Sequence, residues 1–251
     1  MLRLKPIDHG EELPIVDHLD ELRSRLMVLG AAFFVAFGLT TWQSDLVLEI
    51  VNAPLPDGLQ PITLGPAEPF ITTLKNSAYA ALLLVLPIVL YQVYAFLVPA
   101  IGPRERKLAL PLLLMVPVLF IGGVVFCYVV VLPPALDFLL SFNASEFNTQ
   151  VRASDYYDFA TLTMLAMGLG FQVPVGVLVL TRLGVVSVDK LRRSRRYAIL
   201  AIAVLAALLP TLDPITLVLE MVPLMLLYEA SIQLARLFTP AEALRPEDVP
   251  G

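Results

Sequence analysis

The sequence predicts an all-α membrane protein with six transmembrane helices, and three observations lead to this fold class. The first is composition, because 58% of the residues are hydrophobic and 16% are charged, against about 45–50% and about 25% in ordinary soluble domains. The second is six long apolar runs, and the third is the placement of basic residues in alternate gaps between them. The runs cover residues 26–42, 76–98, 108–132, 159–183, 197–209 and 215–234.

The basic residues of the gaps indicate the topology. They lie before the first run, after the second, after the fourth and after the sixth, whereas Lys75 and Arg152 lie in the other gaps. Because Lys and Arg in short flanking loops are retained in the cytoplasm, we place both termini there and the two long loops outside. The cytoplasmic set is Arg3, Lys5, Arg23, Arg25, Arg104, Arg106, Lys107, Lys190, Arg192, Arg193, Arg195, Arg196, Arg236 and Arg245.

Run lengths predict two kinds of helix. The second, third and fourth runs supply the about 20 helical residues that cross a hydrocarbon core about 30 Å thick. The fifth run has only residues 197–209 between Arg196 and Pro210, so its helix must end inside the bilayer, thin it or be shielded by neighbouring helices. The turn that follows carries two prolines, and Asp213 is placed to cap the last helix. The last two helices are therefore predicted to form a short hairpin.

Prolines inside the other runs predict bent helices, because proline removes a backbone donor and clashes with the preceding turn. A curved bundle is expected. The prolines are Pro87, Pro111, Pro117, Pro174 and Pro223.

The two outer loops differ in character. The first, residues 43–74, contains Pro54 and four further prolines with two glycines, which predicts a rigid, turn-rich segment. The second, residues 133–158, begins with an amphipathic stretch at 136–142 and predicts a short interfacial helix followed by a turn.

The domain organisation expected from these patterns is simple. Residues 1–17 form an acidic cytoplasmic leader, residues 18–236 form one six-helix transmembrane domain, and residues 237–251 form a disordered cytoplasmic tail. The first run has no small-residue cleavage pattern after it, which predicts that it is retained and not removed as a signal peptide.

Enzyme chemistry finds little support in the sequence. The two histidines, His9 and His18, both precede the first run, and no serine or cysteine lies in a nucleophile motif. The single Cys127 lies within an apolar run and is expected to be a packing residue. We therefore expect no catalytic residues, no metal, no cofactor and no nucleic-acid partner.

Two cytoplasmic segments carry the most specific pattern. The first, residues 18–26, reads HLDELRSRL and enters the first membrane helix, where Glu21 faces Arg25 at the i, i+4 spacing of a local ion pair. The second, residues 91–107, reads YQVYAFLVPAIGPRERK, which alone is also typical of an aromatic belt followed by a basic anchor.

Together these segments resemble the TatC family, the multispanning core of the twin-arginine protein translocase. The resemblance extends from about residue 18 to 236 through a series of short motifs. They are Ala53-Pro-Leu55, Pro69-Phe70, Phe171-Gln-Val-Pro174, Leu191-Arg-Arg-Ser-Arg-Arg-Tyr197, and Thr211, Asp213, Pro223 and Glu229.

The resemblance implies a glove-like bundle of six helices in a prokaryotic cytoplasmic membrane, with both termini cytoplasmic. It implies a receptor for the twin-arginine signal peptides of folded precursor proteins. Its other implied partners are the single-span proteins TatA and TatB, further copies of itself and membrane lipid. With TatA and TatB it would move the precursors across an energised membrane.

The resemblance also implies roles for particular residues. Glu21 and Glu105 match the signal-recognition acids, and carboxylates suit this role because each guanidinium can bind one through two parallel charged hydrogen bonds. The implied interface adds Arg23 and Arg25 as orienting residues and Phe96 and Pro99 as shaping residues, while Pro54 and Asp213 match outer-face positions.

Gln172 departs from the family pattern, which often has glutamate at this position of the fourth helix. A glutamine can form hydrogen bonds between helices but cannot titrate, so an obligatory proton-carrying role is excluded for it. Contact with a partner helix, retention of water and simple interhelical bonding remain open.

A secondary transporter or small-solute channel is the competing class. That class predicts internal symmetry, paired broken helices and ionisable residues along a route. The sequence shows no repeat, and Glu220 and Glu229 lie towards opposite ends of one predicted helix.

Overall fold

The computed structural model describes residues 15–56, 58–97, 106–147, 149–182, 184–207 and 213–238, and this part of the chain is helical apart from loops and one isolated β-bridge. The predicted leader and tail lie almost entirely outside the described residues. The helices are α1 (Ile15–Trp42), α2 (Ser44–Asn52), α3 (Glu68–Leu97), α4 (Arg106–Phe126), a π-helical turn (Cys127–Val131), α5 (Leu132–Ser141), α6 (Ala153–Gly170), α7 (Val173–Arg182), α8 (Val188–Arg193), α9 (Arg195–Ala207) and α10 (Pro214–Phe238).

Five helical segments of the described chain are long and apolar enough to cross a membrane. The sixth predicted span corresponds to α9, which has 13 residues and is therefore about 20 Å long, short of the about 30 Å of a hydrocarbon core. The expectation that this helix is short is confirmed. The long segments are 20–42, 68–93, 113–141, 153–182 and 214–236.

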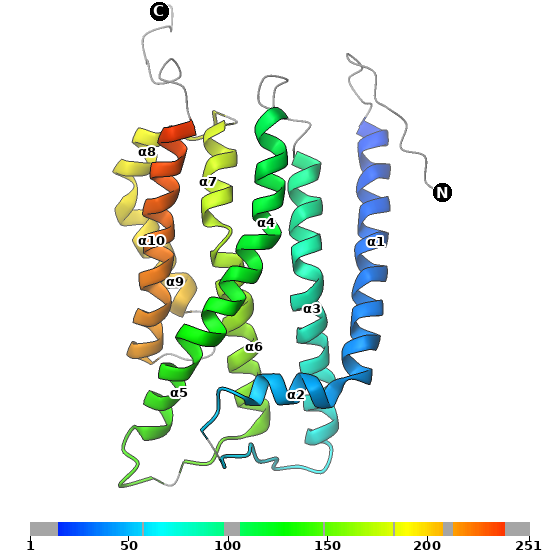
Figure 1. Ribbon diagram of the computed structural model, residues 1–251, viewed down its shortest axis with the longest axis vertical. Coiled ribbons are helices and arrows are strands. Elements are labelled where there is room, and N and C mark those ends of the chain that lie inside the picture. Colours follow the sequence, from blue (N-terminus) through cyan, green and yellow to red (C-terminus); the bar gives the residue numbers. More distant parts are fainter. Residues whose placement is uncertain are drawn as a thin grey trace, which may run out of the picture.

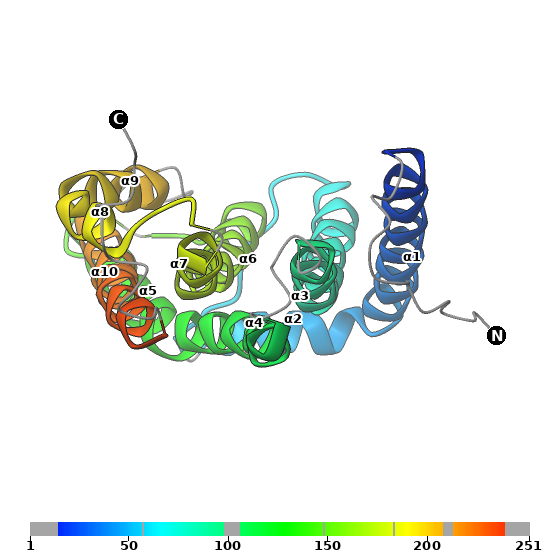
Figure 2. The same ribbon diagram turned by 90° about the horizontal axis from the view of Figure 1, so that it is seen from above.

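The helices form an open, curved row (Figures 1 and 2). α1 stands at one edge, where it packs on α3, and α8, α9 and α10 stand at the other. α1 begins and α10 ends at the same end of the bundle, which also carries α8; we call it the basic end. The opposite end carries α2, and we call it the loop end. The curved bundle expected from the sequence is present.

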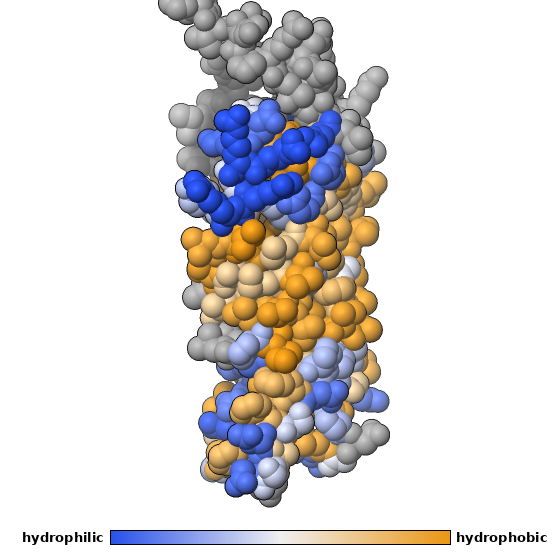
Figure 3. Space-filling model, turned by 90° about the vertical axis from the view of Figure 1, so that its left-hand side faces the viewer, coloured by the Kyte–Doolittle hydropathy of each residue, from blue (hydrophilic) through white to orange (hydrophobic). Residues whose placement is uncertain are grey.

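The surface has the banding of a membrane protein. Figure 3 shows the face formed by the α8–α10 edge, which is strongly hydrophilic at the basic end and apolar across its middle. Lys190, Arg192 and Arg193 of α8 are exposed at that end. Large apolar side chains such as Phe34, Leu84 and Leu226 are exposed elsewhere along the spans, as expected where lipid is the solvent.

The third predicted run continues without a break into the second outer loop. α4 passes through the π-helical turn directly into α5, so residues 113–141 form one apolar segment. Leu132, Ala135 and Leu136 are buried in the core. The short helix expected near residues 136–142 is present as α5, which is followed by a turn. It continues a membrane helix and its apolar face packs on protein, so it is not a separate helix. Its position at a membrane interface stays a prediction.

The first outer loop contains a helix that the sequence analysis missed. α2 lies across the loop end beside α3. The hydroxyls of Tyr128 and Tyr156 donate to the carbonyls of Ile50 and Val51 near its end, at 2.7 and 2.5 Å. These carbonyls belong to the last turn, which has few intrahelical partners, so two other helices hold α2 in place.

The fourth predicted run is interrupted. α6 ends at Gly170 and α7 begins at Val173, which leaves Phe171 and Gln172 at the junction. Pro174 explains the interruption, since it has no N–H to donate to the preceding turn.

α4 and α6 cross in close contact just before this junction. A Cβ atom added to Gly123 of α4 would lie 2.7 Å from the carbonyl oxygen of Met167 and 2.9 Å from the Cα of Gly168. Only glycine allows the two backbones to approach this closely. This crossing joins the centre of the row, since Val124 and Met167 also belong to the main apolar core.

Candidate functional site

Residues of the two most specific sequence segments, 18–26 and 91–107, meet at the basic end. α1 carries Glu21 and Arg25, and the last part of α3 carries Gln92. Arg25 donates to Glu21 Oε1 from Nε at 3.0 Å and from Nη2 at 2.5 Å. Its Nη1 donates to Gln92 Oε1 at 2.5 Å and to the Gln92 carbonyl at 3.4 Å.

This arrangement gives Arg25 a positioning role that spacing alone did not reveal. The expected i, i+4 ion pair with Glu21 is present, and the same guanidinium also ties α1 to α3. The side chains of Arg25 and Glu21 are 25% and 39% exposed, so the acid remains open to the aqueous side. Arg23 is exposed on the same stretch of α1.

Three of the expected recognition residues have little or no description in the structure. Phe96 lies in the last turn of α3, and Pro99 and Glu105 lie outside the described residues. α3 ends at Leu97 and α4 begins at Arg106, and both of these helix ends lie at the basic end.

Gln172 is turned into the bundle. Its Nε2 donates to the carbonyl oxygen of Val116 on α4 at 3.1 Å, and the residue is 8% exposed. Its Oε1 is buried with no hydrogen-bond partner among the described residues. The bond to Val116 fits the interhelical bonding that the sequence left open. The amide oxygen, which has no partner among the described residues, is an acceptor that a bound water would satisfy.

The two outer-face positions have clear structural settings. Asp213 Oδ1 accepts a hydrogen bond from the Thr216 N–H at 2.8 Å, and Pro214 is the first residue of α10. This is the helix cap that the sequence predicted. Pro54 is half-buried after α2, next to Leu55, which belongs to the main core.

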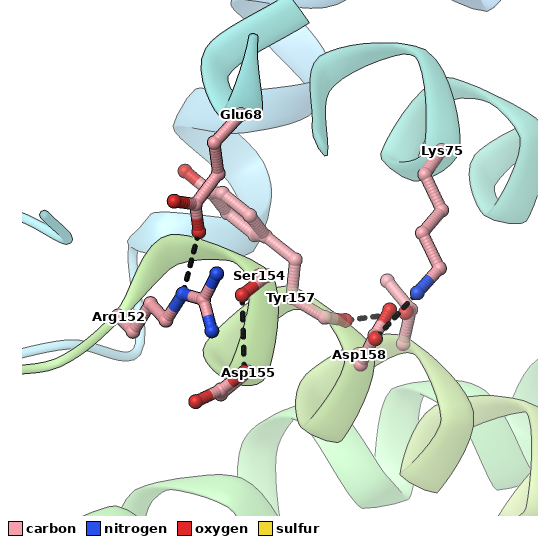
Figure 4. Close-up of polar contacts among 8 residues, drawn as sticks. Glu68, Lys75, Arg152, Ser154, Asp155, Tyr157 and Asp158 are labelled. Atoms are coloured by element: carbon pink, nitrogen blue, oxygen red, sulfur yellow. Dashed lines mark hydrogen bonds and ion pairs between the residues drawn. The ribbon is translucent and has the colours of Figure 1, made fainter. Parts of the chain in front are cut away.

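The sequence analysis missed an ionic clamp at the loop end (Figure 4). Arg152 Nε lies 2.7 Å from Glu68 Oε1, and Lys75 Nζ lies 2.5 Å from Asp158 Oδ2. Both pairs join the start of α3 to the start of α6 or the residue before it. The hydrogen bond that Arg152 donates to the Glu68 carboxylate raises the pKa of the Arg152 guanidinium. The signal was available, because Lys75 and Arg152 are the two basic residues that break the charge pattern.

Backbone pairing strengthens the clamp. The Ile62 N–H donates to the Val151 carbonyl and the Ala153 N–H donates to the Ile62 carbonyl, both at 2.8 Å, which forms the isolated parallel bridge between Ile62 and Arg152. The two outer loops are thus joined to each other. Within the described residues, no group of three or more His, Cys, Asp or Glu side chains could hold a metal ion.

The chain is similar to known proteins in both sequence and structure. The family described as "Sec-independent protein translocase protein (TatC)" matches residues 17–223. A protein of that name from Magnetococcus marinus is 36% identical over 234 residues, which cover 92% of this chain and 86% of the relative. The one from Deinococcus radiodurans is 35% identical over 247 residues, covering 93% and 90%.

A chloroplast relative and a solved structure agree. "Sec-independent protein translocase protein TATC, chloroplastic" from Pisum sativum is 40% identical over 222 residues, and this chain spans 62% of its length. "Crystal Structure of Twin Arginine Translocase Receptor- TatC" is 35% identical, covers 91% of this chain and 100% of its own, and superimposes with a TM-score of 0.78.

Proposed function

The chain belongs to the TatC family of Sec-independent protein translocase proteins, and from this premise we propose that it is a twin-arginine signal-peptide receptor. In this role it is the core membrane component of a translocase that exports folded proteins across an energised membrane. Its activity is transport, and no catalytic residue is assigned.

The observation that carries the proposal is the junction of Glu21, Arg25 and Gln92. Arg25 connects the α1 segment to the last part of α3, so the acid on α1 has a defined position relative to Gln92 of α3. In the proposed complex Glu21 and Glu105 each bind one arginine of the signal peptide.

The chemistry of the acids suits this reading. An ionised carboxylate has two oxygens and about four lone-pair sites, so Glu21 can bind Arg25 and a peptide guanidinium together. Arg23 and Arg25 orient the acid, while Phe96 and Pro99 shape the surface against the peptide.

The proposed topology places the basic end in the cytoplasm of a prokaryote, with both termini on that side of its inner membrane. The exposed charges of α8 support this orientation. At the loop end, the exceptional Lys75 and Arg152 are each paired with an acid. These acids offset the positive charges of Lys75 and Arg152. The two residues therefore depart less from the rule that basic residues stay on the cytoplasmic side.

The proposed partners are folded precursors with twin-arginine signals, the single-span proteins TatA and TatB, membrane lipid and further copies of this chain in a larger complex. Within the membrane, Gln172 is proposed to contact a partner helix or retained water and to link this contact to the helix bundle. Pro54 and Asp213 support the outer face by holding the end of α2 and the start of α10.

Site-specific photocrosslinking tests the receptor role. A photoreactive residue replaces exposed Ser24 beside the junction, or exposed Gln60 at the loop end as the matched control. A twin-arginine precursor should crosslink to the Ser24 probe, and a twin-lysine precursor should do so much less, because lysine cannot form the two parallel bonds.

Variants of the acids complete the test. Glu21→Ala and Glu105→Ala should each reduce crosslinking, with the larger loss for Glu105→Ala, while the protein still inserts in the membrane. Equal crosslinking of both precursors in the parent protein, or unchanged crosslinking in the double variant, would refute the assignment of these residues.

A further inference from the structure

Three residues with buried side-chain oxygens lie along one face of α10, beginning at its N-terminal cap. Asp213, Thr216 and Glu220 are separated by three and four residues, so they stack along one face. Thr216 and Glu220 are each 1% exposed. Asp213 Oδ2, Thr216 Oγ1 and Glu220 Oε1 are buried and have no hydrogen-bond partner among the residues that the structure describes.

Glu220 lies on the helix that contacts the π-helical turn. Cys127 of that turn and Glu220 are both buried, with 0% and 1% of their surfaces exposed. The main apolar core includes Val131 and Leu132, at the end of the turn and directly after it, and Leu224 of α10. The Glu220 carboxyl is therefore buried within a membrane span whose neighbouring core is apolar, and π-helical turns frequently mark functional positions.

No ion pair joins the Glu220 carboxyl to a cation among the described residues, and the cations of α8, which also contacts α10, are exposed at the basic end. α7 has no ionisable side chain before Arg182, and α9 has none after Tyr197. Asp137, the ionisable residue of α5, is exposed. An isolated ionised carboxylate in such surroundings is far less favourable than its neutral form, and buried polar atoms without partners are usually satisfied by ordered water.

We propose that Asp213, Thr216 and Glu220 form a buried site for water and one exchangeable proton, with the Glu220 carboxyl as the proton-binding group. Water enters at the start of α10, where Asp213 is half-buried, and Thr216 links the entrance to Glu220. The carboxylate takes a proton from hydronium and releases water, and the reverse step returns the proton. The site does not depend on the receptor function proposed above.

Infrared spectroscopy of the full chain in lipid vesicles tests the proposal at neutral pH. The wild-type protein should show the C=O stretch of a protonated carboxyl, and ¹³C-labelling of glutamate should shift that band. Transfer to D2O should also shift it, since the proton exchanges with water. Glu220→Gln should remove the band, whereas Glu229→Gln, on the same helix but exposed and paired with Arg195, should retain it.

Each result decides part of the proposal. Absence of a glutamate-sensitive carboxyl band in the wild-type protein overturns it, and this measurement does not require any variant to fold. A band that survives in Glu220→Gln overturns the assignment to Glu220. A band that does not respond to D2O overturns the water route and leaves a closed structural carboxyl. Slower exchange in Thr216→Val, which has nearly the same shape, supports the route through Thr216, and an unchanged rate removes that residue from the site.

Discussion

Arg25 contacts two helices with one side chain. It pairs with Glu21 on its own helix and binds Gln92 on α3. An exposed i, i+4 ion pair contributes only a few tenths of a kcal/mol, so the pair with Glu21 alone would be a weak determinant of structure. The bond to Gln92 adds a tie between this end of α1 and α3.

The first prediction concerns this bond. Gln92→Ala should weaken precursor binding roughly fivefold, because loss of a hydrogen bond in a partly buried place costs about 1 kcal/mol. Crosslinking from the Ser24 probe measures the change at several precursor concentrations.

Thr40→Ala is the matched control. Thr40 Oγ1 donates to the Ser77 carbonyl at 2.8 Å and so ties α1 to α3 far from the junction. This variant should leave precursor binding unchanged. If both variants weaken binding equally, general loosening of α1 explains the effect and the role given to Gln92 is wrong.

The amide of Gln172 donates a hydrogen bond that an ionised glutamate at the same position could not donate. The NH2 group donates to Val116 on α4, while an ionised glutamate at the same place has no proton to donate to that carbonyl. A protonated glutamate would retain the bond. The position therefore favours a neutral hydrogen-bond donor.

The second prediction separates bonding from packing at Gln172. Gln172→Glu should keep transport, and Gln172→Leu should lose much of it and disturb assembly with TatA before signal binding, because the donor to Val116 is lost. Transport of a folded reporter and crosslinking to TatA and TatB measure these effects. Full activity of Gln172→Leu would show that the side chain only fills space.

At the scale of elements, α9 is the unusual helix. Its 13 residues begin at Arg195, which pairs with Glu229 of α10 at 2.7 Å. This pair holds the start of α9 at the basic end. The helix therefore ends well before the opposite surface of a bilayer of ordinary thickness, and thinning of the lipid beside it is one way to accommodate this mismatch.

The third prediction follows from this shortness. Insertion of four leucines after Leu205 should impair transport more than it impairs precursor binding, because it removes the mismatch without touching the junction of α1 and α3. Val204→Leu, at an exposed position of the same helix, controls for added apolar volume. Normal transport by the lengthened protein would mean that thinning beside α9 is incidental.

At the scale of the whole molecule, the crossing of α4 and α6 holds the centre of the curved row. Gly123 meets the α6 backbone at a distance that excludes any side chain, whereas a Cβ atom on the adjacent Gly122 would have no atom within 4 Å. Substitution of these two neighbouring glycines therefore separates two effects. A side chain at Gly123 would clash with α6, whereas one at Gly122 would change helix propensity alone.

The fourth prediction uses this comparison. Gly123→Ala should destabilise the bundle by about 1–3 kcal/mol, since the backbones must separate, while Gly122→Ala should be neutral or stabilise by up to about 1 kcal/mol. Thermal unfolding of both variants in the same detergent measures the difference. Equal unfolding temperatures would contradict the close crossing.

The sequence alone was sufficient for the features that depend on solvent and local chain chemistry. Apolar runs and flanking charges predicted the membrane class and the shortness of α9, since water and lipid act on each segment separately. The cap at Asp213 and the pair between Glu21 and Arg25 were also predictable, because each involves residues within one helical turn.

Contacts between distant segments were decided only by the tertiary structure. The bond between Arg25 and Gln92 joins residues 67 positions apart, and the partner of Arg152 is 84 positions away. The apolar face near Leu136 could equally have faced lipid or protein, so periodicity could not show that α5 enters the core. The burial of Glu220 likewise depends on how α10 packs on its neighbours, because the energy of a buried group is set by the neighbours that folding brings to it.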